Sequence, residues 1–149
     1  MKTKYESILV AVDGSKEAEW AFQKAIAIAK RNQAILNLIH VIDTRSFAAI
    51  EAYDRSIADR ATDYGKDLLT KYKQQAAEAG VPRVNTYVEY GSPKTVIPKD
   101  AAKEVKADLI VCGATGLNAM ERFLIGSVSE HITRAAKCDV LVVRTEKGE

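Results

Sequence analysis

The chain has little cysteine and little histidine, and these shortages exclude several kinds of site. Its two cysteines, Cys112 and Cys138, are too few and too differently placed for a disulfide framework or a cysteine-rich metal site, so we expect reduced thiols. The two histidines, His40 and His131, have no cysteine or carboxylate at metal-ligand spacing. The sequence therefore predicts no metal site, no catalytic histidine, and packed or solvated side chains at these positions.

Charge and hydrophobicity also stay short of the extremes that define some protein classes. The net charge is +2, and the 28% of charged residues mix both signs, so there is no basic stripe of the kind that binds nucleic acid. No apolar run is long enough to span a bilayer, and residues 1–7 lead into a strand-like segment rather than a signal peptide. We expect a soluble cytoplasmic protein without a nucleic-acid partner and without membrane insertion.

Two common phosphate-binding motifs are absent as well. The chain has no Gly-x-x-x-x-Gly-Lys-Ser/Thr, and its first strand-like segment ends in Asp13-Gly14-Ser15 without Gly-x-Gly-x-x-Gly. The sequence therefore contains neither a P-loop nor a dinucleotide-binding fingerprint.

What is present is a regular alternation of strand-like and helix-like segments along all 149 residues. Strands are expected at 8–12, 35–42, 84–90, 108–112 and 139–144, with helices between them. The alternation predicts a single domain, residues 1–149, with an α/β fold: an open, mostly parallel, Rossmann-like five-stranded sheet with helices on both faces. Pro98 falls inside the expected third helix and predicts a kink or a late restart there.

The most informative motif is Gly113-Ala114-Thr115-Gly116, followed after nine residues by Gly126-Ser127. It joins the apolar strand at 108–112 to a helix whose start shows a capping box, Ser127 to Glu130. The first amides of a helix lack intrahelical partners and carry partial positive charge, and glycine lets an oxygen approach the backbone closely. The combination predicts a split cradle for the phosphates of a nucleotide. Each glycine taken singly is also explained by an ordinary turn or helix start.

Asp13, at the end of the first strand, is the second candidate for a residue of the binding site. Ligands of such sheets bind beyond the carboxyl ends of the strands, where the strand order reverses. A carboxylate there can accept a hydrogen bond from a ribose hydroxyl, or it can cap the turn into the first helix by accepting a backbone N–H. The residue type does not decide between these two roles.

At this point the chain resembles the universal stress protein family over nearly its full length. The matching segments are 8–15, His40-Val41, Gly91-Ser92-Pro93, 108–113, 126–129 and 140–144. The Gly-x2-Gly-x9-Gly-Ser spacing is the signature of the ATP-binding branch of that family. The resemblance implies a sheet order of 3-2-1-4-5 and a stress-response or regulatory protein that binds ATP, alone or with Mg²⁺ or Mn²⁺, as a binder or switch more than as a catalyst.

The resemblance also assigns residues to the nucleotide. It implies that Val12, Asp13 and Val41 surround the adenosine, with Asp13 near the ribose and the backbone of Val41 near the adenine. The residues that would hold the phosphates are Gly113, Thr115, Gly116, Gly126, Ser127, Val128 and Ser129. It further implies a homodimer through the fifth strand, because a bare apolar edge invites pairing with its own copy.

The residues themselves favour binding over fast turnover. No P-loop lysine, no pair of magnesium-binding carboxylates and no base for a water is evident, and Glu130 is interpreted as a capping residue. Two alternatives stay open. One is slow ATP hydrolysis at the same site, and the other is a nucleotide-independent interaction module that uses the fifth strand, Trp20 or the loop at 43–47. The loop at 117–125 has no assigned role, and the protein partner is unidentified in each case.

Overall fold

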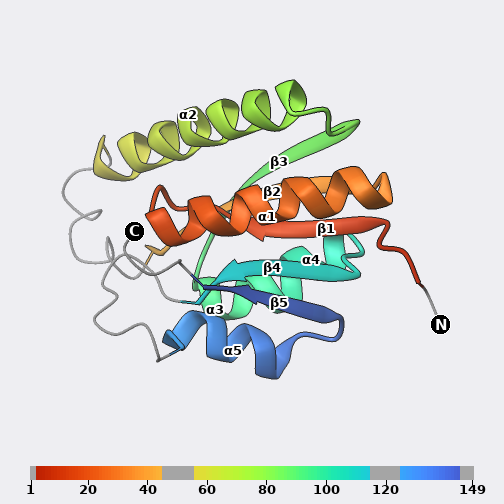
Figure 1. Cartoon of the computed structure of the whole chain (residues 1–149). Coiled ribbons are helices and arrows are strands. Elements are labelled where there is room, and N and C mark those ends of the chain that lie inside the picture. The colour runs from red at the N-terminus through yellow and green to blue at the C-terminus, as the bar shows by residue number, and fades with distance from the viewer. Residues whose placement is uncertain (1–2, 45–55, 115–124, 145–149) are drawn as a thin grey trace.

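Five parallel strands form one sheet in the order β3-β2-β1-β4-β5, which confirms the predicted fold class and strand order (Figure 1). The computed structural model describes residues 3–44, 56–114 and 125–144. The strands are β1 (Ser7–Ala11), β2 (Ile35–Ile42), β3 (Arg83–Tyr90), β4 (Leu109–Gly113) and β5 (Asp139–Val143). The helices are α1 (Lys16–Asn32), α2 (Ser56–Glu78), α3 (Pro93–Thr95), a π-helical turn (Val96–Ala101), α4 (Ala102–Glu104) and α5 (Ser127–Ala135).

Each face of the sheet has its own apolar core, because successive side chains of a strand point to opposite faces. In the central strand β1, Ile8 and Val10 belong to the core under α1 and α2, whereas Leu9 belongs to the core on the other face. That second core is covered by the π-helical turn, α4 and α5 (Figure 1). All three side chains are fully buried, as a parallel sheet covered on both faces requires.

The core under α1 and α2 contains two large aromatic residues in contact. Phe22 of α1 and Tyr72 of α2 meet edge to face, with ring centroids 4.6 Å apart. Burial, together with a hydrogen bond to the side chain of Glu19, raises the pKa of Tyr72. Trp20, considered above as an interaction residue, is partly buried against the same core. The two helices are thus joined by packing and by one polar contact.

The irregularity predicted at Pro98 is present, but it takes the form of a π-helical turn over Val96–Ala101. Proline has no N–H to donate to the preceding turn, and a π-helical turn absorbs that loss without ending the helix. Pro98 itself is buried against the sheet together with Val96 and Ile97. The chain therefore keeps its helical path from α3 to α4 across the second core.

A buried polar ladder crosses β1, β2 and β3. Asn37 of β2 is 2% exposed, and its Nδ2 donates to Ser7 Oγ at 3.0 Å and to the Ile8 carbonyl at 3.1 Å. Its Oδ1 accepts from Asn85 Nδ2 at 3.3 Å, and Ser7 Oγ donates to the Val105 carbonyl at 2.8 Å. Because a shift of one residue would move Asn37 to the other face, these bonds reinforce the register of the three strands.

We expect Asn37→Ala to lower the free energy of unfolding by about 2 kcal/mol, because buried partners lose their hydrogen bonds and a small cavity forms. Urea unfolding should show a lower midpoint with an unchanged slope. The matched control is Asn85→Ala at the exposed end of the ladder, for which we expect less than about 0.5 kcal/mol. Equal midpoints for Asn37→Ala and the unmodified protein would contradict a stabilising ladder.

Candidate nucleotide-binding site

The candidate site lies where the strand order reverses, at the carboxyl ends of the neighbouring strands β1 and β4. The chain leaves β1 into α1 on one face of the sheet, and it re-enters a helix after β4 as α5 on the other face (Figure 1). Asp13 follows β1 and Gly113 ends β4. The structure therefore brings these two predicted site residues to one edge of the sheet.

Gly113 permits a close approach between β4 and the first turn of α1. A Cβ atom at position 113 would lie 2.9 Å from the carbonyl oxygen of Glu17 and 3.1 Å from its carbonyl carbon. Backbone atoms cannot move aside as a flexible side chain can, so any larger residue would displace the start of α1. The glycine predicted to admit a phosphate is thus also required by the packing of α1.

The two halves of the glycine motif meet directly. The backbone N–H of Gly126 donates to the carbonyl of Ala114 at 2.6 Å, and the N–H of Ala114 donates to the carbonyl of Val143 at 2.9 Å. The segment between Ala114 and Gly126 therefore starts and ends at one place beside β5. Two predicted phosphate ligands, Thr115 and Gly116, lie outside the described residues, as does most of the loop at 117–125.

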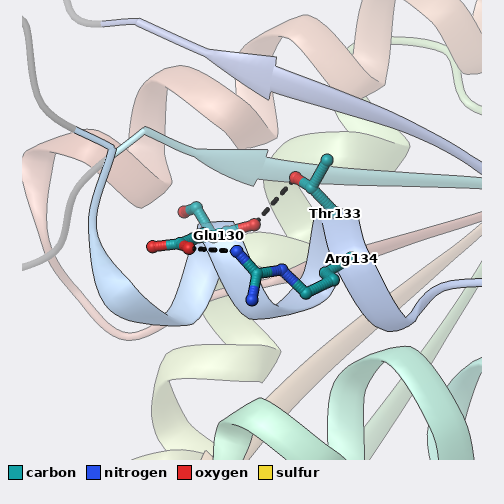
Figure 2. A network of polar contacts seen from close by, with 4 residues as sticks. Glu130, Thr133 and Arg134 are labelled. Atoms are coloured by element: carbon teal, nitrogen blue, oxygen red, sulfur yellow. Dashed lines mark hydrogen bonds and ion pairs between the residues drawn. The ribbon is translucent and has the colours of Figure 1, made fainter.

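The capping box predicted for α5 is wrong. The residue at the N-cap is Gly126, which has an extended backbone and no side chain to cap with, so Ser127 is the first helical residue. The carboxylate of Glu130 lies 2.7 Å from the guanidinium of Arg134. Figure 2 shows this pair, with Glu130 directed toward Arg134 and not back to the helix start. As a result no described side chain caps the first amides of α5, and these amides suit an anion.

The three residues that start α5 have different surroundings. Ser127 is exposed, and Val128 packs partly against the second core. Ser129 is 5% exposed; its hydroxyl donates to the carbonyl of Gly113, and its carbonyl accepts from Thr133 Oγ1 at 2.8 Å. The Ser129 side chain therefore holds the start of α5 against the end of β4.

Asp13 has the turn-capping role that was one of its two possibilities. Its Oδ1 accepts from the N–H of Ser15 at 2.8 Å, and Ser15 Oγ in turn accepts from the N–H of Ala18 at 3.1 Å at the N-cap of α1. Asp13 is exposed, and among the described residues its Oδ2 receives no hydrogen bond. One carboxylate oxygen thus shapes the turn, and the other is open to a ligand.

The residues predicted around adenosine occupy the ends of β1 and β2. Val12 is 1% exposed in the first core, and its N–H donates to the carbonyl of Ile39 at 2.9 Å. Its carbonyl accepts from Nδ1 of His40 at 2.8 Å, so this histidine is packed into the structure, as one of its predicted states had it. Val41 is half-buried and packs against the second core.

Two residues near this edge were missed by sequence reasoning. The hydroxyl of Tyr64, on α2, lies against Gly14, and Gly65 accommodates the ring of His40. Neither carries a local motif, because the contacts join α2 to strand ends far away in the sequence. Only knowledge of the helix position could have singled them out.

The described cysteines are isolated thiols. Cys112 is buried and contacts Ser129, and burial raises its pKa despite that contact. Cys138 is half-buried, and burial together with the nearby carboxylates of Asp139 and Asp108 raises its pKa. In the described part of the chain no group of three potential metal-binding side chains occurs.

Comparison with known proteins finds a family model, relatives and solved structures that match nearly the whole chain. The model of the universal stress protein family matches residues 4–144. A relative from Staphylococcus saprophyticus named for that family is 56% identical over 143 residues, which are 96% of this chain and 86% of the relative. The chain is similar to the structure of the universal stress protein UspA from Lactobacillus plantarum, with a TM-score of 0.83 and 34% identity, over 96% of this chain and 100% of the other.

A second solved structure, a universal stress protein in complex with cAMP, has a TM-score of 0.70 and 28% identity, over 97% of this chain and 100% of the other. The α/β fold of this chain is thus the fold of a known class of proteins. The chain belongs to the universal stress protein family. No helix among the described residues is both long and apolar enough to cross a membrane.

We expect both thiols to react slowly with iodoacetamide at pH 7, because a raised pKa leaves little thiolate at neutral pH. The reaction of Cys138 should accelerate as the pH rises past 9.0, the ordinary pKa of a cysteine thiol. Cys112 is buried and should react only when the protein unfolds. Mass spectrometry of peptides measures both sites, with urea-unfolded protein as the control. Rapid alkylation of either thiol in folded protein at pH 7 would contradict this assignment.

Proposed function

We propose that this protein binds ATP, alone or with Mg²⁺ or Mn²⁺, and acts in the cytoplasm as a stress-response or regulatory protein, more as a binder or switch than as a catalyst. The observation that carries the proposal is the start of α5 beside Gly113, which no described side chain caps, at the same carboxyl edge of the sheet as the open carboxylate oxygen of Asp13. Amides suit phosphates, and a carboxylate suits ribose hydroxyls. The relative solved with cAMP supports an adenine nucleotide as the ligand class.

In this proposal, the amides that follow Gly113 and Gly126 hold the phosphates, with Ser127 as the exposed hydroxyl among them. Thr115, Gly116, Val128 and Ser129 contribute backbone groups. A divalent ion would take ligands chiefly from the phosphates, as Mg²⁺ commonly does. Asp13 takes the ribose, and Val12 and Val41 border the adenine.

Binding is favoured over hydrolysis by the state of Glu130. A base for an attacking water must be able to reach it, and the Glu130 carboxylate is instead paired with Arg134 one turn further along α5 (Figure 2). Both side chains are largely exposed, so this pair adds little to stability. The pair matters because Glu130 is the acidic residue closest to the cradle in sequence, and its carboxylate is directed along the helix.

We expect ATP to bind the unmodified protein in equilibrium dialysis at millimolar nucleotide, and Asp13→Asn to weaken binding about tenfold or more, the size of a hydrogen bond to a charged group. The asparagine side-chain oxygen can still accept from Ser15, so the turn is preserved while the charge is removed. The matched control is Asp67→Asn on the exposed side of α2, which should bind as the unmodified protein does. No uptake of ATP by the unmodified protein would sink the proposal and favour the nucleotide-independent interaction module.

We also propose that the protein is a homodimer paired through β5. In the described residues β5 pairs only with β4. The Val143 carbonyl accepts from the N–H of Ala114, which follows β4 directly. Because the backbone groups of successive strand residues alternate in direction, those of Val140 and Val142 point to the open edge. Val140, Leu141 and Val142 are half-buried and apolar, which suits pairing with a second copy.

Val142→Pro should convert the dimer to a monomer in sedimentation velocity at micromolar concentration, because proline removes an outward N–H while leaving the bonds to β4. Thr86→Pro on β3, the opposite edge strand, is the control for a general effect of proline and should leave the association state unchanged. Circular dichroism confirms that both variants are folded. A dimer that survives Val142→Pro would place the interface elsewhere.

A further inference from the structure

Two glycines and two aromatic rings join α2 to the site edge. A Cβ atom on Gly14 would lie 2.6 Å from the hydroxyl oxygen of Tyr64, and a Cβ atom on Gly65 would lie 2.6 Å from Cδ2 of His40. Each glycine thus makes room for an aromatic side chain of another element. The rings of Tyr64 and His40 also meet edge to face, with centroids 6.0 Å apart. We call these four residues the aromatic clasp.

The aromatic clasp holds both sides of the residue proposed to bind the ribose. His40 Nδ1 donates to the carbonyl of Val12, immediately before Asp13. Tyr64 contacts Gly14, immediately after Asp13, where the backbone has a positive φ of 83°. Glycine tolerates this conformation and leaves the turn little stiffness of its own, so an outside contact can fix its geometry.

Tyr64 is unusual in being held at this place while remaining 53% exposed. A buried tyrosine would be explained by core packing, but this side chain contributes little apolar burial on its exposed half. Among the described residues, it lies against Gly14 and the ring of His40. An exposed tyrosine held at this place is therefore a candidate for a functional role in the turn.

We propose that Tyr64 is a positioning residue for ribose recognition: it supports the Asp13–Gly14 turn so that the open oxygen of Asp13 accepts hydrogen bonds from the 2′ and 3′ hydroxyls of the nucleotide. This inference rests on the proposed function, since it names the determinant of sugar selectivity in that site. It makes the protein selective for ribonucleotides over nucleotides without those hydroxyls. Through His40 and Gly65, it also ties ligand occupancy to the position of α2.

The test compares ATP with 2′,3′-dideoxy-ATP by isothermal titration calorimetry. The unmodified protein should prefer ATP by about tenfold or more, from the charge-assisted hydrogen bonds at Asp13. In Tyr64→Ala the preference should fall to less than about threefold, because an unsupported turn no longer presents the carboxylate. Tyr64→Phe keeps the ring against His40 but lacks the hydroxyl at Gly14, so its preference should lie between the two.

The matched control is Tyr90→Ala. Tyr90 is 52% exposed and also contacts α2, through a 2.8 Å hydrogen bond to Thr62, but it does not touch the turn. It should retain the full preference for ATP. Thermal melting checks that each variant is folded, and a shift of the His40 ring signals in NMR on ATP addition gives a readout that does not depend on affinity.

The outcomes separate the two claims. If the unmodified protein binds neither nucleotide, the proposed function fails and this inference with it. If it binds ATP selectively and Tyr64→Ala keeps that selectivity, only the positioning role of Tyr64 is overturned. Tighter ATP binding by Tyr64→Ala would also overturn it, because the ring would then obstruct the site.

Discussion

The contact on which the site depends is the one between Gly113 and the two helices that flank it. On one face of the sheet, Gly113 admits the Glu17 backbone in the first turn of α1. On the other face, its carbonyl accepts the hydroxyl of Ser129 in the first turn of α5. A single residue at the end of β4 therefore sets where both helices begin. Since Asp13 and Ser15 lead into α1, the placement of the carboxylate follows from the same contact.

The polar groups around this contact are divided by sign. At the α5 side, amides without a side-chain cap offer partial positive charge. At the α1 side, an exposed carboxylate offers negative charge, and one of its oxygens is already engaged by the Ser15 amide. The carboxylate of Asp13 would repel a phosphate, whereas it can accept a hydrogen bond from a hydroxyl. For the proposed nucleotide, this separation favours one orientation, with the phosphates toward α5 and the sugar toward α1.

The fold could be predicted from sequence because its signals are local and repeated. Five apolar runs separated by helical patterns leave few topologies, and family resemblance supplied the strand order that the structure confirms. Details that depend on distant partners were not accessible. Ser127 to Glu130 has the spacing of a capping box, yet Arg134 competes for that carboxylate and Gly126 takes the cap position. The contact between Tyr64 and Gly14 likewise has no local pattern.

For other residues, the residue type indicated a structural role, but the sequence did not identify the interaction that fulfils it. Asp13 could be placed at a strand end from sequence, and the structure shows that its Oδ1 caps the turn, whereas its contact with a ribose stays a prediction. Pro98 indicated an irregular helix, but not that a π-helical turn would absorb the missing N–H. Thr115 and Gly116 remain predictions, since they lie outside the described residues.

The hydrogen bond from the Gly126 amide to the Ala114 carbonyl has a consequence for how this chain can vary. It joins the two ends of the intervening segment independently of what that segment contains. The segment can therefore change in sequence while both halves of the glycine motif keep their positions. It is a place where the protein can acquire new contacts without rebuilding the junction that supports them.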